Sequence, residues 1–149
     1  MFIMTIGISG SGKSTWVEKR KDNYVIVCPD QIRKEIGGYI SNMNNEVKVW
    51  KLVEKRVVKA IKKNQDVILD STMCKSEKRK EFLEKLPGNC MKIAKVFNID
   101  LEDAQRRVRN DILNNLDRSY VPMEIIEKQF LNFTLDYDKI NTDGFDFIC

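Results

Sequence analysis

The sequence contains no histidine, the commonest general base of enzymes and a frequent zinc ligand. Nucleophiles activated by histidine are therefore excluded, and any general base must be a carboxylate. Cysteine is sparse: four widely spaced residues form no CxxC pair, at Cys28, Cys74, Cys90 and Cys149. We expect free, mostly buried thiols rather than a disulfide framework or a zinc site.

Long apolar runs are also missing, so no segment is predicted to span a membrane. The apolar residues Met1–Ile8 follow no basic segment and run straight into a glycine-rich loop, which favours a first strand over a signal peptide. A cytoplasmic location is the resulting expectation. The chain is expected to be one domain over residues 1–149, and its net charge of +4 suits an anionic substrate without requiring one.

Short β-branched runs alternate with charged amphipathic segments. The alternation predicts an α/β fold, with a parallel sheet of about four or five strands and helices on both faces. The predicted strands are Phe2–Ile8, Tyr24–Cys28, Asp66–Asp70, Met91–Ile99 and a short last one at Phe145–Ile148. The predicted helices are Lys13–Arg20, Gln31–Ile36, Asn45–Lys63, Ser76–Leu86, Leu101–Asn114 and Pro122–Phe133. The loops after Ile8, Cys28 and Asp70 should meet in one cleft, because such sheets bind ligands at the carboxyl ends of their strands.

A glycine-rich segment follows the first predicted strand. Residues 7–14, GISGSGKS, fit the Walker A pattern GxxxxGK[ST]. Its glycines let backbone N–H groups turn toward phosphate oxygens, and Lys13 is placed to reach the β- and γ-phosphates of ATP. The Ser14 hydroxyl is placed to bind Mg²⁺. The predicted nucleotide-binding residues are Ser9, Gly10, Ser11, Gly12, Lys13, Ser14 and Thr15.

A phosphate loop alone does not distinguish a kinase from a GTPase or a motor. The DxxG and NKxD segments of GTPases are not found, because residues 70–73 read DSTM and residues 141–144 read NTDG. Motors usually need a larger domain, so a small P-loop kinase is favoured. Two alternatives stay open within this frame: a kinase acting on a small-molecule hydroxyl, and a nucleotide-binding regulatory module with no acceptor.

The acceptor side is predicted at the carboxyl ends of the second and third strands. Asp30 is placed either to cap the next helix or to accept the proton of an attacking hydroxyl. Arg33, three residues on, is either a solvated surface residue or a clamp for a phosphate of the acceptor. Asp70 ends the third strand as in a loose Walker B segment and is predicted, with Ser14, to hold Mg²⁺.

Arginines cluster further along the chain, at Arg106, Arg107, Arg109 and Arg118. Such a cluster is either a solvated basic face or a helical lid that closes over ATP and brings arginine to the transferred phosphoryl group. Asn114, Asn115 and Asp117 suggest a loop within this segment, which favours the lid.

Several segments resemble the bacteriophage-type polynucleotide 5′-kinases, a family of small P-loop kinases. Residues 5–16 are similar to the family's first segment, and residues 30–33, DQIR, to its D-x-x-R acceptor motif. Residues 67–72 with Lys78 and Arg79 are similar to its third-strand segment, and Arg109-Asn110 with residues 118–122 to its lid. Where the family commonly has an asparagine, this chain has Met73.

The resemblance implies an ATP- and Mg²⁺-dependent kinase that phosphorylates the 5′-hydroxyl ends of DNA or RNA. In that family, the residues matching Lys13 and Ser14 hold ATP and Mg²⁺, and the residue matching Asp30 activates the 5′-hydroxyl. Arg33 would bind the adjacent phosphate, and Arg118 would stabilise the transition state. Arg109 is the further nucleotide-binding residue implied, and Ser71 and Thr72 are implied to contact the acceptor.

Overall fold

The structure is a computed structural model, and it describes residues 1–37, 43–114 and 121–149. Within these residues the strands form one parallel sheet in the order β2-β3-β1-β4-β5, so the first strand lies in the centre. The strands are β1 (Phe2–Ile6), β2 (Val25–Val27), β3 (Val67–Leu69), β4 (Lys92–Val96) and β5 (Phe147–Ile148). The α/β parallel sheet predicted from the alternation of segments is confirmed.

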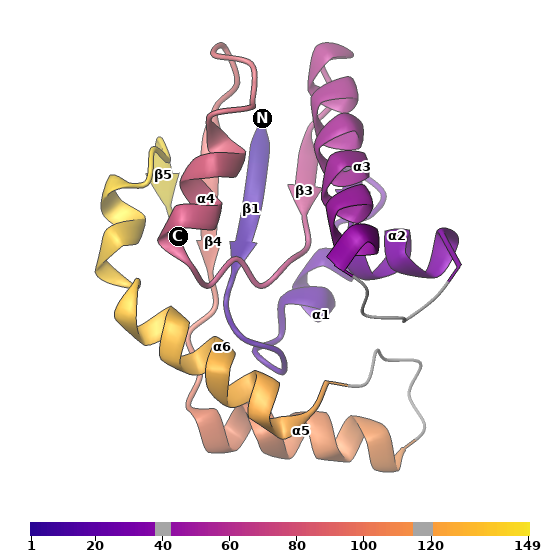
Figure 1. Cartoon of the computed structure of the whole chain (residues 1–149). Helices are drawn as coiled ribbons and strands as arrows, with labels where there is room; N and C mark the ends of the chain where they lie inside the picture. Colours follow the sequence, from indigo (N-terminus) through magenta and orange to yellow (C-terminus); the bar gives the residue numbers. More distant parts are fainter. Residues whose placement is uncertain (38–42, 115–120) are drawn as a thin grey trace.

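Helices connect the strands and cover the sheet (Figure 1). They are α1 (Lys13–Glu18), α2 (Pro29–Glu35), α3 (Met43–Lys62), α4 (Ser76–Leu83), α5 (Leu101–Leu113) and α6 (Met123–Leu135), followed by a 3₁₀ turn at Asp138–Thr142. No helix in the described part of the chain has the length and apolar character needed to cross a bilayer.

The strands are shorter than predicted, chiefly at their carboxyl ends, where the chain leaves the sheet for loops or helices. β1 ends at Ile6, where the chain turns into the glycine-rich loop, and β2 ends at Val27, just before Pro29 opens α2. β4 ends at Val96, and Asp100 forms the N-cap of α5. These early endings leave the loops free to form a site at one edge of the sheet.

The core lies on both faces of the central strand. All five residues of β1 are buried, as expected for a parallel strand covered by helices on both sides. On one face, α3 contributes buried apolar residues at helical spacing, namely Val49, Val53, Val57 and Ala60. On the other face, Ile3 packs in a cluster with Val17 of α1 and Ile68. The site-bearing helices α1 and α3 are thus anchored to opposite faces of one sheet.

The cysteines are all free, as predicted. Cys74 and Cys90 are buried, Cys28 is half-buried and Cys149 is exposed. Burial raises the pKa of the Cys74 thiol to about 11, so this residue is un-ionised at neutral pH and a poor nucleophile. The expectation that most of the thiols are buried is met by two of the four, Cys74 and Cys90.

Candidate active site

The glycine-rich loop lies between β1 and α1, at the edge where the strands point in Figure 1. Gly12 forms the N-cap of α1 with a φ of 97°, a left-handed conformation that favours glycine. Gly10 has a φ of 86°, and a Cβ there would meet the carbonyl oxygen of Ala104 at 2.5 Å. The loop is therefore packed directly against α5, and a side chain at Gly10 would separate the two.

Lys13 is the buried cation of this loop, with 7% of its surface exposed. Its Nζ donates hydrogen bonds to the carbonyl oxygens of Gly7 at 2.9 Å and Ile8 at 2.7 Å, and to Ser11 Oγ at 3.3 Å. The ammonium group therefore lies across the loop. A phosphate oxygen is a stronger acceptor than a carbonyl oxygen, so the predicted contact of Lys13 with ATP needs only a local exchange of partners.

Asp70 lies beside the loop, at the carboxyl end of β3. Burial raises the pKa of its carboxyl group, while the positive charge of Lys13 and a hydrogen bond with Ser14 lower it. The negative charge of Asp30 raises it further. Lys13, Ser14 and Asp30 therefore lie within electrostatic reach of one half-buried carboxylate, although they come from different segments of the chain. The segments that follow β1, β2 and β3 thus meet at one edge of the sheet, as expected.

The pair of Ser14 and Asp70 offers oxygen donors only, which suits Mg²⁺. No cluster of three or more His, Cys, Asp or Glu side chains that could hold a metal occurs among the described residues. Mg²⁺ is commonly held by one or two protein oxygens together with waters and substrate phosphates, so two donors beside a phosphate loop fit this ion. Their role in metal binding stays a prediction.

Asp30 lies in the first turn of α2 and is exposed. The N-cap of α2 is Cys28 and not Asp30, whose side chain pairs with Arg33 one turn later. Arg33 also donates from Nε and Nη2 to the two carboxylate oxygens of Glu46 in α3, at 2.7 Å and 2.9 Å. These bonds to Glu46 are the main reason that the pKa of Arg33 is raised. The guanidinium group is thus held in one orientation at the rim of the cleft.

Glu46 was not predicted as a site residue. It lies outside every motif of the sequence, in the first turn of a long charged helix where glutamate is common. Its hydrogen bonds with Arg33 lower the pKa of its carboxyl group, so Glu46 is ionised at neutral pH. Contact between Glu46 and Arg33 depends on how α2 packs against α3, which the sequence pattern does not reveal.

Ser71 and Thr72 follow Asp70 in a loop that is tied to β1. Thr5 Oγ1 donates to the carbonyl oxygen of Ser71 at 2.9 Å and accepts from its N–H group at 3.0 Å, and the N–H group of Gly7 donates to the Thr72 carbonyl oxygen at 2.9 Å. The Ser71 hydroxyl is buried and has no hydrogen-bond partner among the described residues. Both residues therefore border the phosphate loop, and their contact with an acceptor stays a prediction.

Arg79 stabilises the loop that contains Ser71 and Thr72. It is fully buried, pairs with the buried Asp143, and donates to the carbonyl oxygens of Met73 at 2.9 Å and Cys74 at 3.0 Å. The hydroxyl of Ser76 donates to the other oxygen of Asp143. Arg79 entered the sequence analysis only through the family resemblance, and its burial was not foreseen. This network fixes the path of the backbone immediately after Ser71 and Thr72.

The arginine of α5 that reaches the phosphate loop is Arg107. Its Nη1 donates to the carbonyl oxygen of Gly10 at 3.4 Å. Arg107 lies one turn after Ala104, the residue that packs on Gly10, so both residues face the loop. The sequence analysis included Arg107 in the arginine cluster but did not single it out. The predicted nucleotide-binding Arg109 is exposed on α5, and the predicted catalytic Arg118 lies outside the described residues. The roles of Arg109 and Arg118 stay predictions.

Gln129 of α6 also reaches the loop, and nothing in the sequence pointed to it. The backbone N–H group of Ser9, which was predicted to face the nucleotide, donates to Gln129 Oε1 at 2.8 Å. The two residues are 120 positions apart in the chain. Gln129 therefore binds one of the backbone donors that the phosphate loop offers.

Replacing Gln129 with glutamate is expected to weaken ATP binding on the order of tenfold, with a smaller effect on ADP. The carboxylate keeps an acceptor for the Ser9 N–H group but adds a negative charge beside the predicted γ-phosphate position. Dissociation constants for both nucleotides, measured by calorimetry, test this. Gln129→Met is the control, because it removes the acceptor without adding charge and should affect ATP and ADP alike. Equal ATP binding by Gln129→Glu and the unchanged protein would contradict a position near the phosphates.

Comparisons with known proteins agree with this geometry. The model of the AAA_33 family, described as an AAA domain, matches residues 2–135. No curated protein matches the chain. A chain in the structure of the Pnkp1/Rnl/Hen1 RNA repair complex is similar over 93% of this chain and 45% of its own, with a TM-score of 0.82 and 24% identity. This chain thus spans less than half the length of that relative.

Two further structures are similar over more than four fifths of their own length. Deoxyadenosine kinase from M. mycoides, with products dCMP and a flexible dCDP bound, matches 100% of this chain and 90% of its own, with a TM-score of 0.57 and 19% identity. Shikimate kinase from Acinetobacter baumannii, in complex with shikimate, matches 99% and 82%, with a TM-score of 0.59 and 15% identity. The family model covers most of the sequence, and the chain therefore belongs to the AAA_33 family and has the fold of small P-loop kinases.

Proposed function

We propose that the chain is an ATP-dependent kinase that transfers the γ-phosphate of ATP to the 5′-hydroxyl end of a nucleic acid, DNA or RNA. The observation that carries the proposal is the meeting of two half-sites at one edge of the sheet. The phosphate loop with Lys13 and Ser14 lies beside the half-buried Asp70, and the charge of Asp30 acts on that same carboxylate. A phosphate donor and a hydroxyl acceptor bound at these residues would be adjacent.

Each residue of the site has a proposed role in the transfer. Asp30 would accept the proton of the attacking hydroxyl, since the chain has no histidine to do so. Arg33, held by Glu46, would bind the phosphate next to that hydroxyl. Lys13 would stabilise the charge of the transferred group from within the loop. Ser14 and Asp70 would hold Mg²⁺, which would supply positive charge against the phosphates of ATP.

A phosphate of the acceptor would also break the ion pair between Asp30 and Arg33 and so release Asp30 to act as the base. Arg33 bonds Asp30 through Nη1 and Glu46 through its other two nitrogens. A phosphate that binds at Nη1 would displace the carboxylate of Asp30 while leaving the anchor to Glu46 in place. Asp30 would then be released to accept the proton only when an acceptor with a phosphate is bound. This favours a nucleic acid end over an acceptor without phosphate.

A kinase acting on a small-molecule hydroxyl is the second candidate. Deoxyadenosine kinase and shikimate kinase match this chain over 90% and 82% of their own lengths, whereas only 45% of the relative from the RNA repair complex is matched. The same Asp30 and phosphate loop would serve either acceptor. The salt dependence of acceptor binding distinguishes the two candidate functions. Binding of a nucleic acid through several phosphates weakens steeply with ionic strength, whereas binding of a neutral acceptor does not.

Labelled phosphate from γ-labelled ATP with Mg²⁺ is expected on the 5′ ends of DNA or RNA oligonucleotides that carry a 5′-hydroxyl. The same oligonucleotides with a 5′-phosphate are the matched control and should stay unlabelled. The KM for the oligonucleotide should rise with salt, with a slope of about 0.7 logarithmic units per contacted phosphate. Label only on nucleosides or sugars would establish the small-molecule kinase. ATP hydrolysis that responds to no hydroxyl compound would establish the regulatory module.

A further inference from the structure

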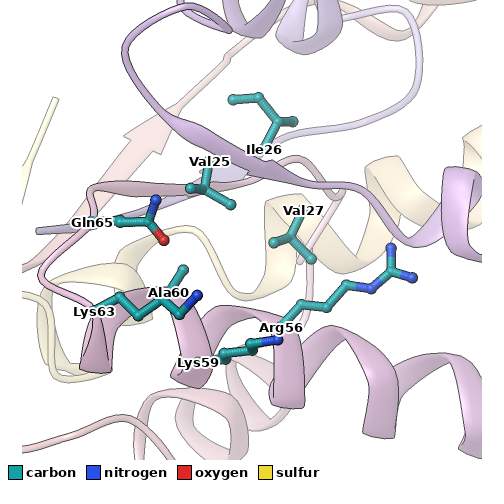
Figure 2. Close-up of a pocket in the computed structure, with 8 residues that line it drawn as sticks. All are labelled: Val25, Ile26, Val27, Arg56, Lys59, Ala60, Lys63 and Gln65. Atoms are coloured by element: carbon teal, nitrogen blue, oxygen red, sulfur yellow. The ribbon is translucent and has the colours of Figure 1, made fainter.

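A groove of about 190 Å³ lies between the edge strand β2 and helix α3, outside the cleft described above (Figure 2). Val25 and Val27 of β2 form part of its apolar lining. Arg56, Lys59 and Lys63 line it from the other side, from α3 and the residue after it. The groove therefore combines an apolar floor with a rim that carries positive charge.

Helix α3 holds all of the chain's excess positive charge. It carries six of the 26 Lys and Arg residues but two of the 22 Asp and Glu residues, which gives it a net charge of +4. The rest of the chain carries the remaining 20 of each sign and is neutral. The overall charge of +4, which looks like a mild general bias in the composition, is thus a local property of one helix.

The same helix connects the groove to the candidate acceptor site. Glu46 in its first turn binds Arg33, and Arg56 further along binds Glu35 at the end of α2. Lys59 and Lys63 follow at the far end of the groove. At a rise of about 1.5 Å per residue, the helix carries the chain about 25 Å from Glu46 to Lys63.

The spacing of these cations suits a phosphodiester backbone. Residues three and four apart on a helix lie about 5–6 Å apart on one face. Arg56 and Lys59 of α3 are three apart, and Lys63, directly after the helix, follows four residues later; all three line the groove. Lysine acts as a flexible point charge, which suits contact with phosphates without reading of bases. None of the residues that line the groove is aromatic, so it offers no platform on which bases could stack.

We propose that this groove binds the backbone of the acceptor strand, several nucleotides downstream of the 5′ end. The inference rests on the proposed function, because it takes the 5′-hydroxyl to lie at Asp30 and the adjacent phosphate at Arg33. The strand leaves Arg33, follows α3, and its phosphates contact Lys59 and Lys63. A length of about 25 Å corresponds to about seven phosphates at the spacing of a B-form strand and to fewer in an extended strand.

Kinetics of a Lys59→Gln/Lys63→Gln double variant test the groove. The acceptors are a nucleoside 3′-monophosphate and a 12-nucleotide strand with a 5′-hydroxyl. The variant is expected to raise the KM for the 12-nucleotide strand about tenfold, with kcat unchanged and no effect on the nucleoside 3′-monophosphate. Its KM should also depend less on salt, by about 1.4 in the logarithmic slope, since two phosphate contacts are lost.

A Lys55→Gln/Lys62→Gln double variant is the matched control. It removes the same charge from the same part of the chain, but neither residue lines the groove. An equal rise in KM in both variants would overturn the proposal, because it would show a diffuse effect of charge. An unchanged KM for the 12-nucleotide strand in Lys59→Gln/Lys63→Gln would also overturn it.

Binding of a fluorescent 12-nucleotide strand without ATP separates this inference from the proposed function. Binding that depends on Lys59 and Lys63, with no phosphate transfer to any 5′-hydroxyl, would support nucleic acid binding in the groove and contradict the proposed 5′-hydroxyl kinase activity. Transfer to 5′-hydroxyl ends with no dependence on these lysines would support the kinase and remove the groove.

Discussion

An Asp30→Asn variant is expected to bind ATP as tightly as the unchanged protein and to transfer phosphate about 10²–10⁴-fold more slowly. Asparagine keeps the size of the side chain and can still accept a hydrogen bond from Arg33, but it cannot take up a proton. The change therefore removes the proposed general base while leaving the local packing intact. ATP affinity by calorimetry and single-turnover transfer to a 5′-hydroxyl oligonucleotide measure the two effects separately.

Asp103→Asn is the matched control. Asp103 lies in the first turn of α5 and pairs with Arg106 three residues on, as Asp30 in the first turn of α2 pairs with Arg33. The control thus removes the same charge from the same kind of helical ion pair, outside the cleft. Its turnover should match that of the unchanged protein. Near-normal turnover in Asp30→Asn would assign the role of base to another group.

Replacing Asp143 with asparagine is expected to lower the free energy of unfolding by about 3–5 kcal/mol. The change leaves the charge of Arg79 buried without its ionic partner, since both side chains of the pair are fully buried. A domain of this size has a total stability of about 5–15 kcal/mol, so the loss would be a large fraction of it. Urea denaturation followed by circular dichroism measures the change.

An exposed ion pair provides the comparison. Glu18, the last residue of α1, forms an exposed ion pair with Lys21 in the following turn, and Glu18→Gln should cost about 0–1 kcal/mol. A double variant, Arg79→Met/Asp143→Leu, should recover part of the loss, because it removes the stranded charge along with its partner. A cost below about 1 kcal/mol for Asp143→Asn would show that the pair does not hold the structure together.

Much of the fold could be predicted because each element has a clear period. The long charged helix was predicted at Asn45–Lys63 and is observed at Met43–Lys62, since its valines recur at helical spacing. The last strand, predicted at Phe145–Ile148, is present but reduced to Phe147–Ile148. Boundaries were the least accurate part, because hydrogen bonding at the ends of elements depends on neighbours distant in the sequence.

The site could be predicted only where it is continuous in the chain. The phosphate loop was recognisable because its glycines, Lys13 and Ser14 are adjacent in one short segment. Glu46 and Gln129 were missed because their partners, Arg33 and Ser9, are 13 and 120 residues away. Their contacts depend on the packing angles of α3 and α6, and a glutamate or glutamine on a helix surface carries no signal of its own.

The central position of β1 has a consequence for the growing polypeptide. β1 precedes both of its neighbours in the chain, since β3 begins at Val67 and β4 at Lys92. During translation, its five residues, four of them apolar, leave the ribosome long before either partner strand exists. The Gly7 N–H group cannot bond the Thr72 carbonyl oxygen until β3 and its loop are made, and the support of Arg79 by Asp143 comes later still. The glycine-rich loop is thus synthesised before the segments that supply these hydrogen bonds, and it acquires them only after those segments are made.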